Sequence, residues 1–480
     1  MSTNHTDRTP PLASGQMVTL TVEDLGHSGE GVGRWEGFTV FVPGGVPGDQ
    51  VEVRITEVKK NYARAALRQV AVPSPHRVAA RCPAVGECGG CPLQVIAYPE
   101  QLRLKRQQVV EALRRLGKLE EVPVHPTLGM DDPWEYRNKA QFPVGFRGGR
   151  VIAGFFAPGT HRIVDIDQCH IQHPLGNEIM RTVKELAQRY QIPIYDEVRH
   201  QGILRHVLVR VGRHTGEAMA VLVTNGPAFP HGRRLAADLM ERVPAVVSVV
   251  QNINPERTNV VLGRENRVLA GRDHILDRIG DLVFAISPVS FFQVNPAQTE
   301  VLYGKALEYA GLTGAETVLD VYCGIGTISL FLARQAREVI GIEVVPEAID
   351  DARENARRNG IGNARFICGD AAETMPELAR KGIRADVIVV DPPRKGCDRP
   401  VLEAMAQMGP RRIVYVSCNP ASLARDLGIL QELGYRTVEV QPVDMFPHTA
   451  HVECVALVSK IEGLTRRATE GSTRPIPEVK

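Results

Sequence analysis

The stretch from Thr317 to Asp391 constrains the fold most, because short apolar runs in it end repeatedly at a glycine or an acidic residue. The run TVLDVY leads into the glycine turn CGIG and then a helical pattern, and later runs end at Glu343, Asp370 and Asp391. Strands that alternate with helical segments predict an open α/β sheet. Such sheets bind ligands beyond the carboxyl ends of their strands. We therefore expect the functional site at that edge.

The glycine turn has the features of a cofactor-binding loop. Gly324 and Gly326 would let the backbone approach a ligand, and the loop leads into a helix N-terminus. Glu343 follows roughly 20 residues later, the distance at which an acidic residue reaches ribose hydroxyls. Asp370, at the end of the third strand, is placed to meet an adenine ring. The loop resembles motif I of the S-adenosylmethionine-dependent methyltransferases, so we expect this cofactor.

The segment IVYVSCNPASLARD, residues 413–426, reads as a buried strand followed by a helix. The polar residues and Pro420 end the strand, which places Cys418 at its carboxyl end. A cysteine is often an ordinary core residue. Here we expect the helix N-terminus that follows to favour the thiolate over the thiol, which makes Cys418 a candidate nucleophile.

Composition limits the alternatives. A chain of 480 residues predicts about three domains, and a net charge of +2 means that nucleic-acid binding would depend on local patches. No apolar run approaches the roughly 18 residues of a membrane span, and the polar start carries no signal-peptide core, so we expect a cytoplasmic protein. Nine cysteines, an odd number, favour metal binding and catalysis over disulfides.

The N-terminal region predicts a small barrel. Residues 1–15 are polar and rich in proline at their end, so we expect a disordered tail. Residues 16–72 contain short strands with turn glycines, which is typical of a closed barrel. The pattern resembles the TRAM domain, an OB-like RNA-binding module. Its last hairpin offers either a basic, aromatic face for single-stranded RNA or a solvated strand edge. The residues concerned are Lys59, Lys60, Tyr62, Arg64 and Arg68.

Three cysteines with C-x5-C-x2-C spacing follow the barrel: Cys82, Cys88 and Cys91. Three thiolates are one ligand short of a tetrahedral zinc site or a four-iron cluster. Cys169 is the best candidate for the fourth ligand, because the remaining cysteines fall inside motifs of the last domain. The spacing does not separate zinc from an iron–sulfur cluster.

The middle of the chain predicts an amphipathic helix over residues 99–117 and then mixed strands and helices. The run Arg137, Asn138 and Lys139 could contact RNA phosphates or lie in a solvated turn.

Four motifs together resemble the RNA (uracil-5-)-methyltransferase family: FFQVN at 291–295, DPPRKG at 391–396, SCNP at 417–420 and HTAHVE at 448–453. The four cysteines and the barrel are similar to its ribosomal-RNA branch. The resemblance implies Cys418 as nucleophile and Glu453 as base. It implies that the cofactor contacts are Gln293, Tyr322, Glu343 and Asp391. It implies a [4Fe-4S] cluster on Cys82, Cys88, Cys91 and Cys169.

The resemblance also implies a multidomain α/β organisation. The expected parts are a tail at 1–15; a TRAM-like OB barrel at 16–72; an α+β central domain with the cluster at 73–98 and 120–275; a Rossmann-like methyltransferase domain at 99–119 and 276–460; and a tail at 461–480. The helix at 99–117 is expected to pack on the methyltransferase domain although it precedes the central one.

The implied activity is methylation of uridine C5 in RNA through a covalent bond between Cys418 and C6, on a flipped or unpaired base. The DPP motif also resembles enzymes that methylate exocyclic amines, but these need no nucleophilic cysteine. A cytosine-5 methyltransferase would use the same covalent chemistry, and only HTAHVE and FFQVN favour uracil. A non-enzymatic iron–sulfur RNA-binding regulator would leave CGIG and Cys418 unexplained.

The RNA expected from the resemblance is 23S ribosomal RNA, because relatives with both barrel and cluster usually modify it. Transfer RNA stays the alternative. The sequence implies no membrane partner and no obligate protein partner.

Overall fold

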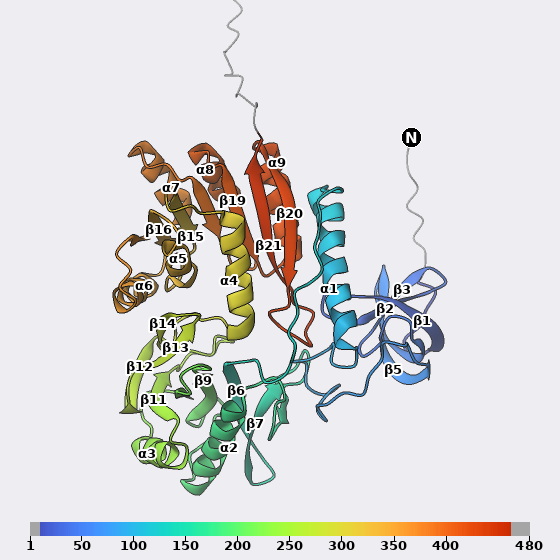
Figure 1. Ribbon diagram of the computed structural model, residues 1–480. Coiled ribbons are helices and arrows are strands. Elements are labelled where there is room, and N and C mark those ends of the chain that lie inside the picture. Colours follow the sequence, from blue (N-terminus) through green and yellow to red (C-terminus); the bar gives the residue numbers. More distant parts are fainter. Residues whose placement is uncertain (1–9, 462–480) are drawn as a thin grey trace, which may run out of the picture.

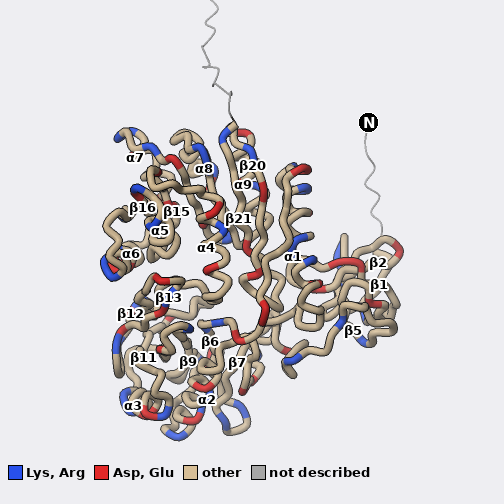
Figure 2. Tube along the Cα trace, in the orientation of Figure 1, with Lys and Arg blue, Asp and Glu red and all other residues tan. Residues whose placement is uncertain are grey.

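The computed structural model describes residues 10–461, which form a small barrel, a central sheet and a larger C-terminal sheet (Figure 1). Within this range no helix combines the length and apolar character needed to cross a membrane. Lys and Arg are interspersed with Asp and Glu over the whole trace (Figure 2). The near-neutral net charge therefore does not result from one strongly basic and one strongly acidic part.

The N-terminal barrel is closed, with strand order β1-β2-β3-β5-β4. Its strands are β1 (Met17–Leu25), β2 (Gly31–Trp35), β3 (Phe38–Val42), β4 (Gln50–Val58) and β5 (Tyr62–Val72). Alternate residues of β1 and β4 are buried, which is the pattern of a strand with one face toward a core. The predicted barrel is confirmed. The expected tail is wrong for residues 10–15, because Leu12 is 6% exposed in the barrel core and the Gly15 amide donates to the Ile55 carbonyl.

The central sheet has the order β12-β11-β10-β9-β6-β7-β8. Its strands are β6 (Lys139–Arg147), β7 (Arg150–Phe156), β8 (Ile163–Asp165), β9 (Leu204–Val211), β10 (Ala218–Thr224), β11 (Val246–Ile253) and β12 (Glu265–Gly271). Two helices, α2 (Pro174–Arg189) and α3 (Gly232–Arg242), pack on the sheet through Ile179, Met180, Leu235 and Leu239. Every residue of β10 is buried. This is the α+β region that the sequence predicts.

A hairpin of β13 (Ile275–Ile279) and β14 (Leu282–Ile286) leads into the C-terminal sheet, whose order is β17-β16-β15-β18-β19-β21-β20. Its strands are β15 (Thr317–Val321), β16 (Glu338–Glu343), β17 (Ala364–Cys368), β18 (Val387–Val390), β19 (Arg412–Ser417), β20 (Tyr435–Val443) and β21 (Glu453–Lys460). Five neighbouring strands are parallel, and β21 is antiparallel to both β19 and β20. The Rossmann-like sheet is confirmed.

Successive strand residues of this sheet point to two separate cores. Val318 and Val414 face one core with helices α4 (Pro296–Ala310), α5 (Thr327–Ala333) and α6 (Pro346–Arg358). Leu319 and Ile413 face the other core with α7 (Ala371–Arg380), α8 (Arg399–Met408) and α9 (Pro420–Glu432). Both faces are therefore covered, and the site must lie at a strand edge.

Helix α1 (Tyr98–Ala112) and its π-helical continuation (Leu113–Gly117) pack against the second face, beside α9 and β20 (Figure 1). Val109 and Leu113 are fully or almost fully buried there. A segment that lies between the barrel and the central sheet in the sequence thus forms part of the C-terminal core.

Candidate active site

Cys418 lies between the end of β19 and the start of α9. The side chain of Asn419 caps α9 by accepting a hydrogen bond from the Ala421 amide at 3.1 Å. Cys418 is half-buried at this junction. Its place at a strand end before a helix is the one that the sequence predicts.

Glu453 begins β21, the antiparallel neighbour of β19. Ser417 pairs with Cys454, so the register places Glu453 next to Cys418 at the same edge of the sheet. The Glu453 side chain is 5% exposed. Burial and the nearby Asp391 raise the pKa of this carboxyl to about 8.

The expected thiolate character of Cys418 is wrong for the protein without ligands. Burial and the carboxylates of Glu453 and Asp391 raise the pKa of the Cys418 thiol to about 11, against a smaller lowering by Arg394. A helix N-terminus favours an anion by only about 0.3–1 kcal/mol, and desolvation together with two carboxylates outweighs it. The free site therefore holds a protonated thiol.

The DPPRKG segment is fastened to α9. Asn419 and Ser422 donate to the Arg394 carbonyl at 3.0 and 3.1 Å. The Cys397 amide donates to the buried Asp426 carboxylate at 2.8 Å, and Tyr415 also donates to it. These bonds explain why LARD follows SCNP in the sequence: its aspartate fixes the loop that carries Asp391 and Arg394 beside the cysteine.

The glycine loop lies at the ends of β15 and β16. Gly326 has a φ of 83°, and a Cβ there would lie 3.1–3.2 Å from Phe366 and Ala352, so glycine is required. A Cβ on Gly324 would meet nothing within 4 Å, which leaves open space above the loop. Glu343 accepts from the Gly324 amide at 3.2 Å. The carboxylate and the loop thus form one continuous wall around that space.

Asp320 is a site residue that sequence reasoning missed. It is fully buried at the end of β15, where Ser329 donates to Oδ2 at 2.5 Å. Oδ1 is also buried and has no hydrogen-bond partner among residues 10–461. Burial raises the pKa of this carboxyl to about 7. The sequence did carry a signal for Asp320, because it is an acidic residue inside the apolar run TVLDVY. Carboxyl groups are rarely buried without a partner or a function.

Four acidic groups surround this edge: Asp320, Glu343, Asp391 and Glu453. S-adenosylmethionine carries a sulfonium and an ammonium group, and such cations are stabilised by nearby carboxylates. The orphan Asp320 oxygen and the open space at Gly324 therefore fit this cofactor.

The remaining predicted cofactor residues differ in burial and in hydrogen bonding. Tyr322 is half-buried with a φ of 67° directly before the glycine loop. Gln293 is 7% exposed. Asp370 ends the loop after β17 but caps α7, accepting from the Ala372 amide at 2.8 Å.

The FFQVN segment is held by the central sheet. Asn138 donates to the Gln293 carbonyl at 3.0 Å, and the buried Arg210 donates to the Pro288 and Ser290 carbonyls. The expectation that Asn138 contacts phosphates is therefore wrong, because its amide is 6% exposed and bonded within the protein. Sequence reasoning missed Arg210, which nothing in the strand pattern distinguishes.

Helix α1 fixes the HTAHVE segment. The buried Lys105 donates to Asp444 at 2.5 Å and to the Phe446 carbonyl at 3.0 Å. Gln101 accepts from the His448 amide at 3.0 Å. His448 is stacked on Trp134, with ring centroids 3.9 Å apart. The segment that leads to Glu453 is thus bound from two sides.

The four predicted ligand cysteines line one cavity of about 290 Å³: Cys82, Cys88, Cys91 and Cys169. Burial and the other three thiols raise the pKa of Cys91 to about 12. Across residues 10–461 the side chains form no group of three or more His, Cys, Asp or Glu that could hold a metal ion as they stand. The cysteines surround a space rather than meet at one point.

Comparison with known proteins agrees with this geometry. The model of the tRNA (uracil-5-)-methyltransferase family matches residues 97–461, and that of the TRAM domain matches residues 11–67. An uncharacterized RNA methyltransferase of Halalkalibacterium halodurans is 53% identical over 93% of this chain and 98% of its own length. One from Caldanaerobacter subterraneus is 50% identical over 93% and 99%.

Among solved structures, the Pyrococcus abyssi tRNA (uracil-54, C5)-methyltransferase in complex with S-adenosyl-L-homocysteine is similar with a TM-score of 0.74. It is 30% identical in sequence, and the match covers 92% of this chain and 99% of that one. The chain belongs to the tRNA (uracil-5-)-methyltransferase family, as an S-adenosylmethionine-dependent RNA methyltransferase.

Proposed function

We propose that the protein methylates C5 of uridine in RNA through a covalent bond between Cys418 and C6. The observation that carries the proposal is the pairing of β19 with β21, which brings a cysteine and a buried carboxyl together. The glycine loop follows β15, two strands away from β19 in the same sheet. Uracil C5 is a poor nucleophile until a thiolate adds to C6 and makes it enolate-like. A cysteine next to a carboxyl is what this route requires.

Each residue has a defined task in this route. The Cys418 thiol releases its proton to solvent, and the thiolate adds to C6, which breaks the C5–C6 π bond and places the electron pair in the enolate. S-adenosylmethionine, when bound, would supply an electrophilic methyl group for C5 and would leave as S-adenosylhomocysteine. Glu453 then removes the C5 proton, and the C6–sulfur bond breaks to release 5-methyluridine and the thiolate. Because the pKa of Glu453 is raised to about 8, this carboxylate is a stronger base than an ordinary glutamate. The buried position of the site requires a flipped or unpaired uridine.

We further propose a [4Fe-4S] cluster on Cys82, Cys88, Cys91 and Cys169. All four line one cavity. Burial and the neighbouring thiols raise the pKa values of Cys88, Cys91 and Cys169, so a cation is needed to stabilise their thiolates. Cysteine thiolates hold both zinc and four-iron clusters, and the resemblance to the ribosomal-RNA branch favours the cluster. The cluster would have a structural role, since methyl transfer needs no redox step.

For the RNA, we propose 23S ribosomal RNA, on the resemblance of the barrel and cysteine spacing to the ribosomal-RNA branch. Transfer RNA is the second candidate, because the similar Pyrococcus abyssi enzyme acts on it. Mass-spectrometric mapping of 5-methyluridine in both RNAs, with and without the gene, separates the two. If both RNAs contain the same amount of 5-methyluridine with and without the gene, the proposed activity is refuted.

A further inference from the structure

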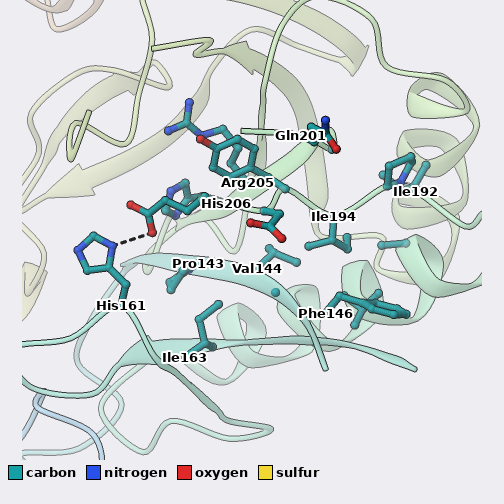
Figure 3. Close-up of a pocket in the computed structure, with 18 of the residues that line it drawn as sticks. Pro143, Val144, Phe146, His161, Ile163, Ile192, Ile194, Gln201, Arg205 and His206 are labelled. Carbon is teal, nitrogen blue, oxygen red and sulfur yellow. Dashed lines mark hydrogen bonds and ion pairs between the residues drawn. The ribbon is translucent and has the colours of Figure 1, made fainter. Parts of the chain in front are cut away.

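One large cavity lies in the central region and outside the active site. Its volume is about 1200 Å³, and it opens between β6, β7, the end of α2 and the start of β9 (Figure 3). None of the predicted cofactor, catalytic or cysteine positions lines it. The proposed chemistry leaves it without a function.

Strand β9 connects this cavity to the active site. Arg205 and His206 line the cavity, and Arg210 on the same strand donates to the carbonyls just before Gln293. Four residues of strand span about 13 Å. One strand therefore lines the cavity near its start and holds the segment that leads to Gln293 near its end.

The cavity wall offers surfaces on which a base could stack. Phe146 is 60% exposed and Phe156 38% exposed, although large apolar side chains are usually buried. Phe156 is stacked on His161, with ring centroids 5.4 Å apart. Tyr195 adds a third aromatic ring. Aromatic side chains of this kind hold unpaired bases in RNA-binding proteins.

The charge of the wall is positive where it is buried. Arg205 is 6% exposed, its guanidinium lies 4.5 Å from the Tyr195 ring centroid, and it donates to the carbonyls of Asn254 and Glu256. Its Nε atom is buried with no partner among residues 10–461. No carboxylate forms an ion pair with it in that range, so its charge is left to act on the cavity.

The acidic groups at the rim are already engaged. Glu197 binds His161 at 2.7 Å. Asp196 accepts from the amides of Val198 and Arg199 at 2.9 and 3.0 Å. Arg199 lines the rim with its side chain 77% exposed and forms an ion pair with Asp196 at 3.9 Å. The wall therefore carries Arg199 and Arg205 beside Asp196 and Glu197. An exposed ion pair contributes little free energy, so an RNA phosphate could take the place of Asp196 at Arg199.

We propose that this cavity is a second RNA-binding site, which takes an unpaired nucleotide of the substrate outside the methylated uridine. The unpaired base would stack on Phe146 or on Phe156, which lie about 16 Å apart along the β6–β7 pair, and Arg199 would contact a phosphate. The inference depends on RNA being the substrate, and it does not depend on uridine C5 being the methylated atom. This second site would let the protein recognise its RNA at a nucleotide other than the methylated uridine.

Binding of fluorescein-labelled 12-nucleotide oligo(A) and oligo(U) RNA tests the proposal. Phe146→Ala should weaken binding of at least one of them about 5- to 150-fold, which corresponds to about 1–3 kcal/mol per stacked base. Arg199→Gln should also weaken it. Two control variants change exposed residues that do not line the cavity. Arg147→Gln changes the arginine next to Phe146, and Val198→Ala changes a residue of the rim loop. These two controls should bind as the wild type does.

A second measurement on the wild type does not depend on variants. Photo-cross-linking with RNA that contains 4-thiouridine, followed by peptide mapping, should label peptides that contain Phe146 or Tyr195. Unchanged affinity of Phe146→Ala and Arg199→Gln, equal weakening by the controls, or the absence of cross-links in both peptides would overturn the proposal. Neither assay requires turnover, so loss of the proposed methylation activity would be seen separately.

Discussion

The exchange Glu453→Gln should make the Cys418 thiol easier to ionise, and only in alkaline solution. In the wild type, burial, Glu453 and Asp391 together raise the pKa of the thiol to about 11. The pKa of Glu453 is about 8, so its carboxyl repels a thiolate above this pH and is neutral below it. Glutamine is neutral throughout. The pKa of the thiol in the variant should therefore lie below that in the wild type, while the two proteins behave alike in mild acid.

The size of the effect follows from the thiolate fraction. A thiol with a pKa of about 11 is about 1% ionised at pH 9, and each unit of lowering increases this fraction about tenfold. Two unit charges a few ångströms apart at an effective dielectric constant of about 20 interact by several kcal/mol, which exceeds one pKa unit. We therefore expect alkylation of Cys418 at pH 9 to be at least about tenfold faster in Glu453→Gln. At pH 6.5 we expect equal rates.

Iodoacetamide labelling between pH 6 and pH 10, with mass spectrometry of the peptide that contains Cys418, measures this rate separately from the other cysteines. Glu347→Gln is the matched control, because it removes an exposed carboxyl on α6. Superimposable profiles of Glu453→Gln and the wild type at pH 9–10 would refute the electrostatic reasoning. An equal acceleration at every pH would refute it too, since it would indicate a loosened site rather than a removed charge.

Three further predictions concern the nucleophile, the cluster and the cofactor. With 5-fluorouridine RNA and S-adenosylmethionine the wild type should form an adduct stable in denaturing gels, and Cys418→Ala should form none; an adduct in the variant contradicts the assignment. Anaerobically purified protein should be brown and absorb near roughly 400 nm, whereas stoichiometric zinc without iron would exclude the iron–sulfur cluster. Glu343→Ala should weaken cofactor binding in calorimetry by about 1–3 kcal/mol, because buried hydroxyls lose their acceptor, and unchanged affinity would remove Glu343 from the site.

The strand ends at the catalytic edge could be predicted from the sequence because their signals are local. Gly326 needs a positive φ, and Glu343 and Cys418 each end an apolar run, so periodicity alone places them at strand ends. The barrel could be predicted for the same reason, since its alternation and glycine turns extend over a few residues.

The supports of the site could not be predicted, because their partners are distant in the sequence. Lys105 binds Asp444 across 339 positions, and Gln101 binds His448 across 347. In the sequence these residues belong to an ordinary amphipathic helix, whose pattern does not say which surface it covers. Arg210 and Asn138 hold FFQVN in the same way from another part of the chain. Only the packed structure shows that the central sheet and α1 both position catalytic segments.

The pKa of Cys418 could not be predicted either, because it depends on residues that are distant in the sequence. The direction of its shift gives a reason for the acidic groups at this edge of the sheet. The helix N-terminus is visible in the sequence, whereas Asp391 and Glu453 reach the thiol only through strand order. A protonated thiol resists alkylation and oxidation, so the free enzyme would keep the proposed nucleophile in an unreactive form. A cofactor with a sulfonium charge partly cancels these carboxylates, which lowers the pKa of a nearby thiol. The acidic groups that hold the cationic cofactor would thus also ensure that Cys418 becomes reactive after the methyl donor has bound, when an adduct with uridine can be completed.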